Sequence, residues 1–157
     1  MINLESISEC ALFHGLDADD LQSVTAIMTP ITFEANQTIL KESTISTDLY
    51  LIQSGRVSIE LDTSSYNTTG SEQLVILRSG DIFGEMAFLE NKRRSAHAIA
   101  LDRVDAVTMA GDQLKSLFKK NYRIGYLMMK NIAVILSNRL IDTNFKWRNG
   151  IRSNPPF

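Results

Sequence analysis

The sequence predicts a single α+β domain in which an antiparallel β-barrel is flanked by N-terminal helices and a long C-terminal helix. Three observations support this fold class. Apolar residues recur at helical spacing before residue 30 and after residue 112, and at strand spacing between them. The central strand patterns are short and separated by turn residues, which is typical of a sandwich or barrel. A length of 157 residues fits one domain with its own core.

Residues 1–30 form the predicted N-terminal helices. Asp17 is placed to cap a helix whose apolar stripe extends to Met28, and Pro30 is expected to end that helix. The acidic run at 17–20 lies in the first helical turn, where the helix dipole favours negative charge, so we assign it no catalytic role.

Residues 31–110 form the predicted β-barrel. The segment TDLYLIQSGRVSIEL (47–61) is interpreted as two strands joined by a tight hairpin at Ser54-Gly55. A polar loop is expected at 64–72. Further strands are expected at 73–77, 96–100 and 105–109.

Residues 112–147 form the predicted C-terminal helices. Asp112 is expected to cap a short helix, and a long helix is expected from 122 to 144. The long helix carries two adjacent apolar stripes, which is wider than docking on one core requires. Three explanations remain open: deep burial, pairing with the same helix of a second copy, or a lid over a ligand. Phe145 and Trp147 could belong to such a lid or to a frayed end.

Composition excludes several classes of function. The sequence has 16 basic and 18 acidic residues, and a net charge of −2 is not typical of a protein whose main role is to bind the phosphate backbone of a nucleic acid. Cys10 is the only cysteine, so we expect no intramolecular disulfide and no cysteine-rich zinc site. His14 and His97 are far apart in sequence, so another metal site would need mainly carboxylates, and we expect none. The start has no secretory pattern, and apolar runs such as IAVIL (132–136) are too short to span a membrane. We therefore expect a cytoplasmic protein.

The stretch FGEMAFLENKRRSA (83–96) has the composition of an anion site. Gly84 permits close approach of the backbone, and the first N–H groups of a short EMAFLE helix could face an anion. Arg94 offers a planar fork for a phosphate, and Ser95 adds a hydroxyl. Glu85 fits only if the ligand also presents a hydroxyl, such as that of a ribose. Alternatively, Glu85 caps the helix and the arginines are solvated loop charges.

The same stretch resembles the phosphate-binding cassette of the cyclic nucleotide-binding domain family, which includes catabolite activator protein and kinase regulatory subunits. The matching residues are Phe83, Gly84, Glu85, Met86, Ala87, Arg94, Ser95 and Ala96. Segments 12–16, 48–57 and 129–140 are also similar to the family. The resemblance implies a jelly roll, or double-stranded β-helix. It also implies that Glu85 binds a ribose 2′-hydroxyl and Arg94 the cyclic phosphate, with Ser95 and the backbone N–H groups of 84–87 completing the cradle.

Two positions depart from the family pattern. Asn36 stands where the family has a turn glycine, and asparagine tolerates a positive φ. His97 follows the cassette where a smaller or β-branched residue is usual, and we expect a strand side chain that could touch the ligand.

The resemblance implies a stand-alone cyclic nucleotide sensor that works in signal transduction through a protein partner or an oligomer. The expected ligand is cAMP, with cGMP the alternative. No Walker, G-x-S-x-G or H-E-x-x-H motif is present, so we expect no enzyme. We expect a homodimer through the C-terminal helix, no direct DNA binding and no membrane contact. Two alternatives remain: a nucleotide-free interaction module of the same fold, and the regulatory half of a DNA-binding regulator.

Overall fold

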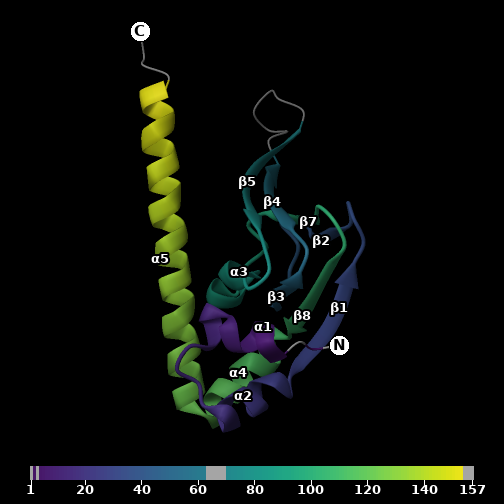
Figure 1. Ribbon diagram of the computed structural model, residues 1–157, viewed down its shortest axis with the longest axis vertical. Coiled ribbons are helices and arrows are strands. Elements are labelled where there is room, and N and C mark those ends of the chain that lie inside the picture. The colour runs from purple at the N-terminus through teal and green to yellow at the C-terminus, as the bar shows by residue number, and fades with distance from the viewer. Residues whose placement is uncertain (1, 3, 63–69, 154–157) are drawn as a thin grey trace.

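The computed structural model describes residues 2, 4–62 and 70–153 of the chain. Helices gather at one end of an elongated body, strands form the middle, and the long helix α5 runs beside both (Figure 1). The predicted combination of antiparallel sheets, N-terminal helices and a long C-terminal helix is confirmed. The polar loop expected at 64–72 lies largely outside the described residues, and β5 begins within its predicted span, at Ser71.

The described strands form two antiparallel sheets of four strands each, and these sheets are not closed into the predicted barrel. The first sheet has the order β1-β8-β3-β6, with bounds Met28–Phe33, Val104–Met109, Leu49–Ser54 and Ile82–Phe83. The second has the order β2-β7-β4-β5, with bounds Thr38–Leu40, His97–Ala100, Val57–Asp62 and Ser71–Leu77.

The predicted hairpin between β3 and β4 is wrong. These consecutive strands lie in different sheets, β3 beside β8 and β4 between β7 and β5. Gly55, at φ +87°, turns the chain from one sheet to the other. The turn is fixed by Asp102, which accepts hydrogen bonds from the backbone N–H of Arg56 and from its Nε, each at 2.7 Å.

The N-terminal segment contains α1 (Leu4–Glu9), a 3₁₀ turn η1 (Ala11–Phe13) and α2 (Ala18–Thr25). Asp17 caps α2 as predicted, in a reciprocal capping box with Asp20. The expected continuation to Met28 is wrong, because Met28 begins β1. Pro30 lies inside β1 rather than ending a helix. An edge strand can hold a proline because one side of it needs no ladder hydrogen bond.

The remaining helices are α3 (Glu85–Glu90), α4 (Gly111–Lys120) and α5 (Tyr122–Ser153). Asp112 does not cap α4: the cap residue is Ala110, and Asp112 lies in the first turn. The helix α5 extends well beyond the predicted end at 144. Asn36 has φ +66°, which confirms the expected turn conformation.

The buried core has two parts. One lies between the helices and the first sheet and includes Leu12, Val24, Leu114 and Ile124. The other lies between the strands and includes Ile52, Val57 and Phe83. No helix among the described residues is both long and apolar enough to cross a membrane.

Candidate functional site

Gly84 joins β6 to α3, and the backbone of another segment packs closely against it. Its φ of +86° lies in the left-handed region, which favours glycine. A Cβ atom at this position would lie 2.7 Å from both Arg94 Nη1 and the Asp48 carbonyl oxygen. The glycine is therefore required by conformation and by space.

Arg94 is buried at the centre of the cassette, with 4% of its surface exposed. Its Nη1 donates to the Gly84 carbonyl oxygen at 2.9 Å, and its Nη2 donates to Ser46 Oγ at 2.9 Å and to the Asp48 carbonyl oxygen at 2.8 Å. Its Nε is buried and has no hydrogen-bond partner among the described residues. Burial lowers the pKa of Arg94, while the neighbouring Tyr50 and Asp48 act to raise it. An arginine keeps its charge in a protein, so a cation whose Nε is an unused donor lies at this position.

Glu85, the first residue of α3, is a second buried charge, with 6% exposed. Its Oε1 accepts a hydrogen bond from Nη1 of Arg139 on α5 at 2.8 Å. Nη2 of the same arginine donates to the carbonyl oxygen of Ile82 on β6. The Oε2 atom of Glu85 accepts no hydrogen bond from any residue that the structure describes.

A cavity of about 480 Å³ lies between the cassette, the second sheet and α5. This volume is within the range of small-molecule sites in proteins. The structure brings all eight predicted site residues to its wall: Phe83, Gly84, Glu85, Met86, Ala87, Arg94, Ser95 and Ala96. Phe83 and Ala87 are buried, whereas Met86 and Ser95 are exposed, with Ser95 Oγ 3.6 Å from Met86 Sδ.

The cavity wall combines apolar surface with a small charge imbalance. Strands contribute Ile59, Val75, Leu77 and Ala98, together with other apolar residues. The charged residues are Arg94, Arg139 and Lys146 against Glu85 and Asp142, an excess of one positive charge with His97 neutral. The site is therefore suited to a partly apolar molecule with a single negative charge.

His97 lies on β7 and lines this cavity, as expected for a strand residue. Its Nδ1 accepts a hydrogen bond from the Glu42 backbone N–H at 3.2 Å, which fixes the ring orientation. His97 Nε2 lies 3.9 Å from Glu42 Oε2.

The helix α5 covers the cavity with residues between Leu136 and Lys146. The aromatic lid considered from the sequence is not what the structure shows, since Phe145 and Trp147 are 63% and 70% exposed and do not line the cavity. The frayed end is equally wrong, because both residues lie inside α5.

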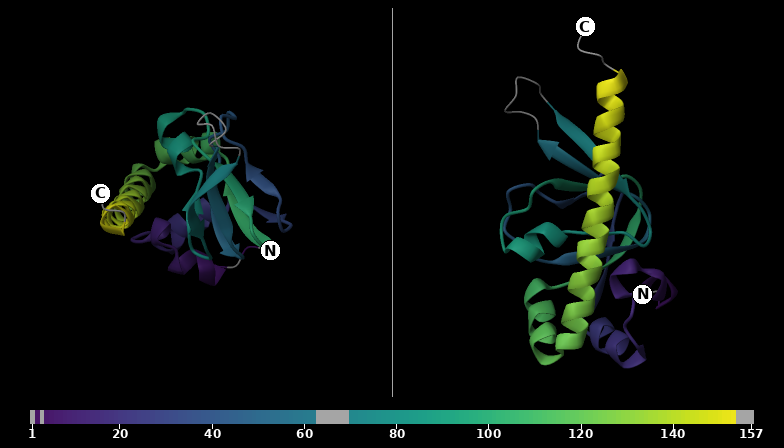
Figure 2. Two further views of the ribbon diagram at one scale, coloured as in Figure 1. Left: turned by 90° about the horizontal axis from the view of Figure 1, so that it is seen from above. Right: turned by 90° about the vertical axis from the view of Figure 1, so that its left-hand side faces the viewer.

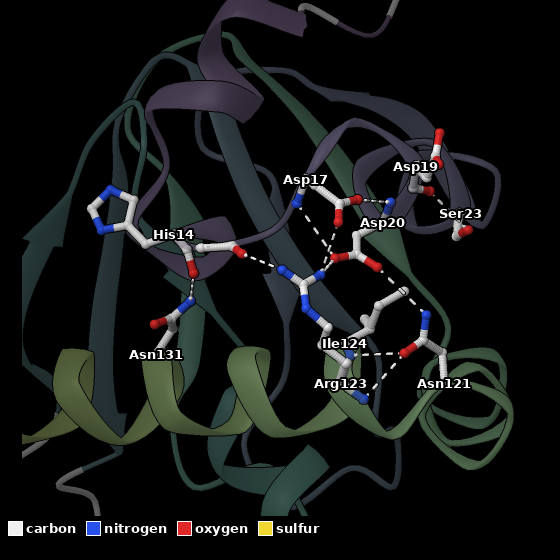
Figure 3. Close-up of polar contacts among 10 residues, drawn as sticks. His14, Asp17, Asp19, Asp20, Ser23, Asn121, Arg123, Ile124 and Asn131 are labelled. Atoms are coloured by element: carbon white, nitrogen blue, oxygen red, sulfur yellow. Dashed lines mark hydrogen bonds and ion pairs between the residues drawn. The ribbon is translucent and has the colours of Figure 1, made fainter.

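The start of α5 is fixed to the N-terminal segment (Figure 3). Arg123 pairs with Asp17 and Asp20 and donates to the Gly15 carbonyl oxygen at 3.1 Å. Asn131 donates to the carbonyl oxygens of Leu12 and His14, each at 2.9 Å. These contacts set the direction in which the helix runs beside the strands (Figure 2).

Sequence reasoning missed Arg139, Ser46 and the carbonyl group of Asp48. The signal for Arg139 is a single cation within the otherwise uncharged stretch IAVILSNRLI (132–141). No local pattern marks Ser46, because the segment before β3 meets the cassette only in the folded chain. There the Arg94 backbone N–H donates to the Thr44 carbonyl oxygen at 2.9 Å, and the Ser43 N–H donates to the Arg94 carbonyl oxygen at 2.9 Å.

Comparison with known proteins gives the family. The chain is 29% identical to Glutaminase 2 of Bradyrhizobium diazoefficiens over 140 residues, covering 89% of this chain and 21% of that protein. It is 27% identical over 141 residues to the CRP-like cAMP-activated global transcriptional regulator of Mycobacterium tuberculosis, covering 89% and 59%. It thus spans less than two thirds of either relative.

The fold is also similar to a solved cyclic nucleotide-binding domain from Methylobacillus flagellatus. The TM-score is 0.80 at 21% identity, over 91% of this chain and 79% of that one. Residues 30–121, more than half of the chain, match the family described as cyclic nucleotide-binding domain. The cassette and the cavity beside it thus lie in a chain that belongs to the cyclic nucleotide-binding domain family.

Proposed function

We propose that this chain binds a cyclic nucleoside monophosphate in the cavity between the cassette and α5, with cAMP as the preferred ligand. The observation that carries the proposal is Arg94, a buried cation at the cavity wall whose Nε has no partner among the described residues. A buried donor without a partner is costly, and an anionic oxygen would satisfy it.

The residues at the cavity fit the three parts of such a ligand. Arg94 and Ser95 would hold the cyclic phosphate, which carries one negative charge and so balances the local excess of one positive charge. Glu85 would accept a hydrogen bond from the ribose 2′-hydroxyl through Oε2. The apolar strand residues Ile59, Val75 and Leu77 would contact the base.

The preference for cAMP over cGMP is supported by the name of one relative, which describes that protein as cAMP-activated. The base would lie against α5, where Asp142, Thr143 and Lys146 reach the cavity. The eight strands in two sheets also agree with the jelly-roll form that the sequence resemblance implies.

Ligand binding would be transmitted through α5 to a second copy of this chain. Seven residues of this helix follow the alternating spacing of three and four that forms a coiled-coil seam. They are Tyr126, Met129, Ala133, Leu136, Leu140, Thr143 and Trp147. This stripe is called here the α5 seam. Leu136 packs against the helical part of the core, whereas the other six residues are exposed within the described chain, with Tyr126, Leu140 and Trp147 at 66%, 61% and 70%.

The α5 seam and the cavity share Leu136, Leu140 and Thr143. A ligand in the cavity would therefore change the surroundings of residues that also face a second copy. We assign the chain a regulatory binding role with no catalytic step, and we expect no contact with DNA from a chain with a net charge of −2.

The test is calorimetric titration of the purified chain with cAMP, cGMP and 5′-AMP. We expect saturable binding of cAMP, weaker binding of cGMP, and the weakest binding of 5′-AMP, which has a different charge and shape at the phosphate. The nucleotide recovered afterwards should be unchanged. Absence of binding to both cyclic nucleotides would favour the alternative of a nucleotide-free interaction module.

A further inference from the structure

Residues 41–48, called here the β2–β3 segment because they join these two strands, hold Arg94 at several points. The Arg94 backbone N–H donates to the Thr44 carbonyl oxygen at 2.9 Å. The Arg94 guanidinium donates to Ser46 Oγ at 2.9 Å and to the Asp48 carbonyl oxygen at 2.8 Å. The position of this cation at the cavity wall therefore depends on how firmly the β2–β3 segment is held.

The start of the β2–β3 segment is held by His97 on β7. The Glu42 backbone N–H donates to His97 Nδ1 at 3.2 Å, and Glu42 Oε2 accepts a hydrogen bond from the Asp62 backbone N–H at 3.0 Å. The following residues, 43–45, are exposed. Ser43 has φ +67°, a left-handed conformation that is unfavourable for a serine. Because burial contributes little here, the segment depends on its hydrogen bonds.

The bond from Glu42 to His97 exists only while the imidazole ring is neutral. A neutral ring has one nitrogen that accepts and one that donates, so Nδ1 is the acceptor and Nε2 carries the proton. A protonated ring donates from both nitrogens, and its Nδ1–H would then face the Glu42 N–H. Protonation of His97 therefore removes a hydrogen bond that holds the start of the β2–β3 segment.

Carboxylates on two neighbouring elements can receive the protonated ring. Glu42 Oε2 lies 3.9 Å from His97 Nε2. Glu60 on β4 is the Cα partner of His97, so the two side chains lie on the same face of the sheet. Hydrogen bonds from Ser71 and Ser58 lower the pKa of Glu60, partial burial opposes them, and His97 adds a smaller lowering effect. The protonated ring thus has an arrangement of its own, paired with carboxylates instead of the Glu42 backbone.

His97 also lines the cavity, and a proton on it would act on the charge of the cavity wall. The other charged residues of this wall are Arg94 and Glu85 of the cassette and Arg139, Asp142 and Lys146 of α5. Protonation would raise the positive excess from one charge to two, which by itself favours an anionic ligand. Glu42 and Glu60 offset this charge at close range. We therefore expect the lost hydrogen bond to dominate.

We propose that His97 is a positioning residue through which protonation weakens ligand binding in the cavity. The neutral ring holds Glu42, and with it the segment that fixes Arg94, whereas the protonated ring releases the start of that segment. By linkage, a ligand that needs Arg94 in place opposes protonation of His97. The proposal rests on the proposed binding of a cyclic nucleotide, but release of the segment can be measured without any nucleotide.

The first experiment uses the ligand-free protein. Hydrogen exchange of residues 42–46 is measured at about pH 5.5 and 7.5, within the range in which histidines change charge, and is expressed relative to the intrinsic rate at each pH. Protection in the unmutated chain should fall about threefold to tenfold at the lower pH, as expected for one hydrogen bond. His97→Asn keeps an acceptor near the Nδ1 position without a titrating ring, so its protection should not change with pH. His97→Leu lacks the acceptor and should be poorly protected at both pH values.

The matched control is His14→Asn. His14 is the only other histidine in the sequence, is exposed and does not line the cavity. This variant should lose protection at the lower pH as the unmutated chain does. If His97→Asn loses protection to the same extent as the control, the His97 ring is not responsible and the proposal is wrong.

The second experiment is calorimetric titration with cAMP at the same two pH values. The unmutated chain and His14→Asn should bind about threefold to tenfold more weakly at the lower pH. The affinity of His97→Asn should not depend on pH, and His97→Leu should bind weakly at both values. Tighter binding by the unmutated chain at the lower pH would show that the charge of the ring acts directly on the ligand, and it would overturn the proposal.

The route through Arg94 is tested with Ser46→Ala, which removes one hydrogen bond to the guanidinium. If His97 acts by holding the segment that carries Ser46, the double variant His97→Leu, Ser46→Ala should lose less affinity than the two single losses predict together. Fully additive losses would mean that His97 reaches the ligand by another route, and they would refute the positioning role.

The two proposals fail in different ways. If the unmutated chain binds no cyclic nucleotide at either pH, the proposed function fails, while the ligand-free exchange still decides whether His97 holds the β2–β3 segment. If the unmutated chain binds cAMP with the same affinity at both pH values, the proposed function stands and the role of His97 is refuted.

Discussion

The Arg94 guanidinium donates to the carbonyl oxygen of Gly84 at 2.9 Å, across ten positions of sequence. This bond joins the first and last parts of the cassette around α3. Two further hydrogen bonds from Nη2, to Ser46 and Asp48, hold the same guanidinium. Three groups from two segments therefore fix the cation before a ligand arrives, which reduces the ordering that binding would require.

Arg94→Ala should weaken cAMP binding by roughly thirty-fold to several thousand-fold, since truncating a buried charged partner costs on the order of 2–5 kcal/mol. Calorimetric titration measures the loss. The control is Arg93→Ala: Arg93 is exposed and donates to the Ser43 carbonyl oxygen at 2.8 Å without lining the cavity. Equal affinities of the Arg94 variant and the unmutated chain would refute the assigned role.

Gly84→Ala should destabilise the fold more than Gly80→Ala. Both glycines have φ near +87° (+86° and +87°), so each alanine incurs a left-handed penalty of about 1–2 kcal/mol. Only at position 84 would the new Cβ also meet Arg94 and the Asp48 carbonyl group, whereas nothing lies within 4 Å at position 80. Overpacking should add about 1–3 kcal/mol.

Denaturant unfolding of the two glycine variants gives the comparison directly. The same variants are titrated with cAMP, and only Gly84→Ala should lose affinity, because it alone displaces the guanidinium. Identical unfolding free energies for both variants would contradict the close packing at Gly84.

Glu85→Ala and removal of the ligand 2′-hydroxyl should have non-additive effects. If the carboxylate accepts a hydrogen bond from that hydroxyl, each change deletes the same hydrogen bond. The Glu85→Ala variant should therefore bind 2′-deoxy-cAMP and cAMP with equal affinity. A double-mutant cycle of four titrations measures the coupling. Fully additive losses would place the ribose away from Glu85.

Much of the cassette could be predicted from the sequence because its geometry is local. The glycine conformation at 84, the short helix α3 and the buried arginine all lie within fourteen residues, and each follows from the chemistry of one residue type. Whether the cassette binds a nucleotide stays a prediction.

The contacts that reach outside the cassette could not be predicted. Arg139 meets Glu85 across 54 positions, and this depends on how α5 is tilted by Arg123 and the N-terminal segment. The assumed hairpin at Gly55 failed for a related reason. Alternation of apolar and polar residues identifies β3 and β4 as strands but does not say which strands they pair with. Here β3 pairs with the distant β8, and β4 pairs with β7 and with β5, the next strand along the chain.

The free energy of unfolding should fall between about pH 9 and 11, partly because the thiol of Cys10 ionises more easily in the unfolded chain than in the folded one. Burial raises the pKa of this thiol to about 11 from its ordinary 9.0, with a smaller contribution from Asp81, while a hydrogen bond from the Leu12 backbone lowers it. Above pH 9 the unfolded chain loses the thiol proton and the folded chain keeps it. The stabilising contribution is therefore complete below pH 9 and is lost as the pH rises through 11.

The measurement is the unfolding free energy at several pH values for the unmutated chain and for Cys10→Ala. Lysine and tyrosine titrations occur in both proteins, so the difference between the two curves isolates the thiol. That difference should change by about 2 kcal/mol across this window. Parallel curves would mean that the thiol ionises equally easily in both states.

The α5 seam should mediate a homodimer, and a charge on it should separate the copies without unfolding them. Met129→Asp is the informative substitution, because Met129 is 40% exposed, belongs to the seam and does not line the cavity beside the cassette. In a two-fold helix pair, the introduced carboxylate would be buried opposite the same carboxylate of the second copy, without a cation, and the two would repel each other.

The control, Val134→Asp, changes a residue that is 51% exposed on the same helix but outside the seam. Light scattering at tens of micromolar should give a dimer for the unmutated chain and for Val134→Asp, and a monomer with an unchanged circular dichroism spectrum for Met129→Asp. If the unmutated chain is monomeric both with and without cAMP, the predicted homodimer is wrong.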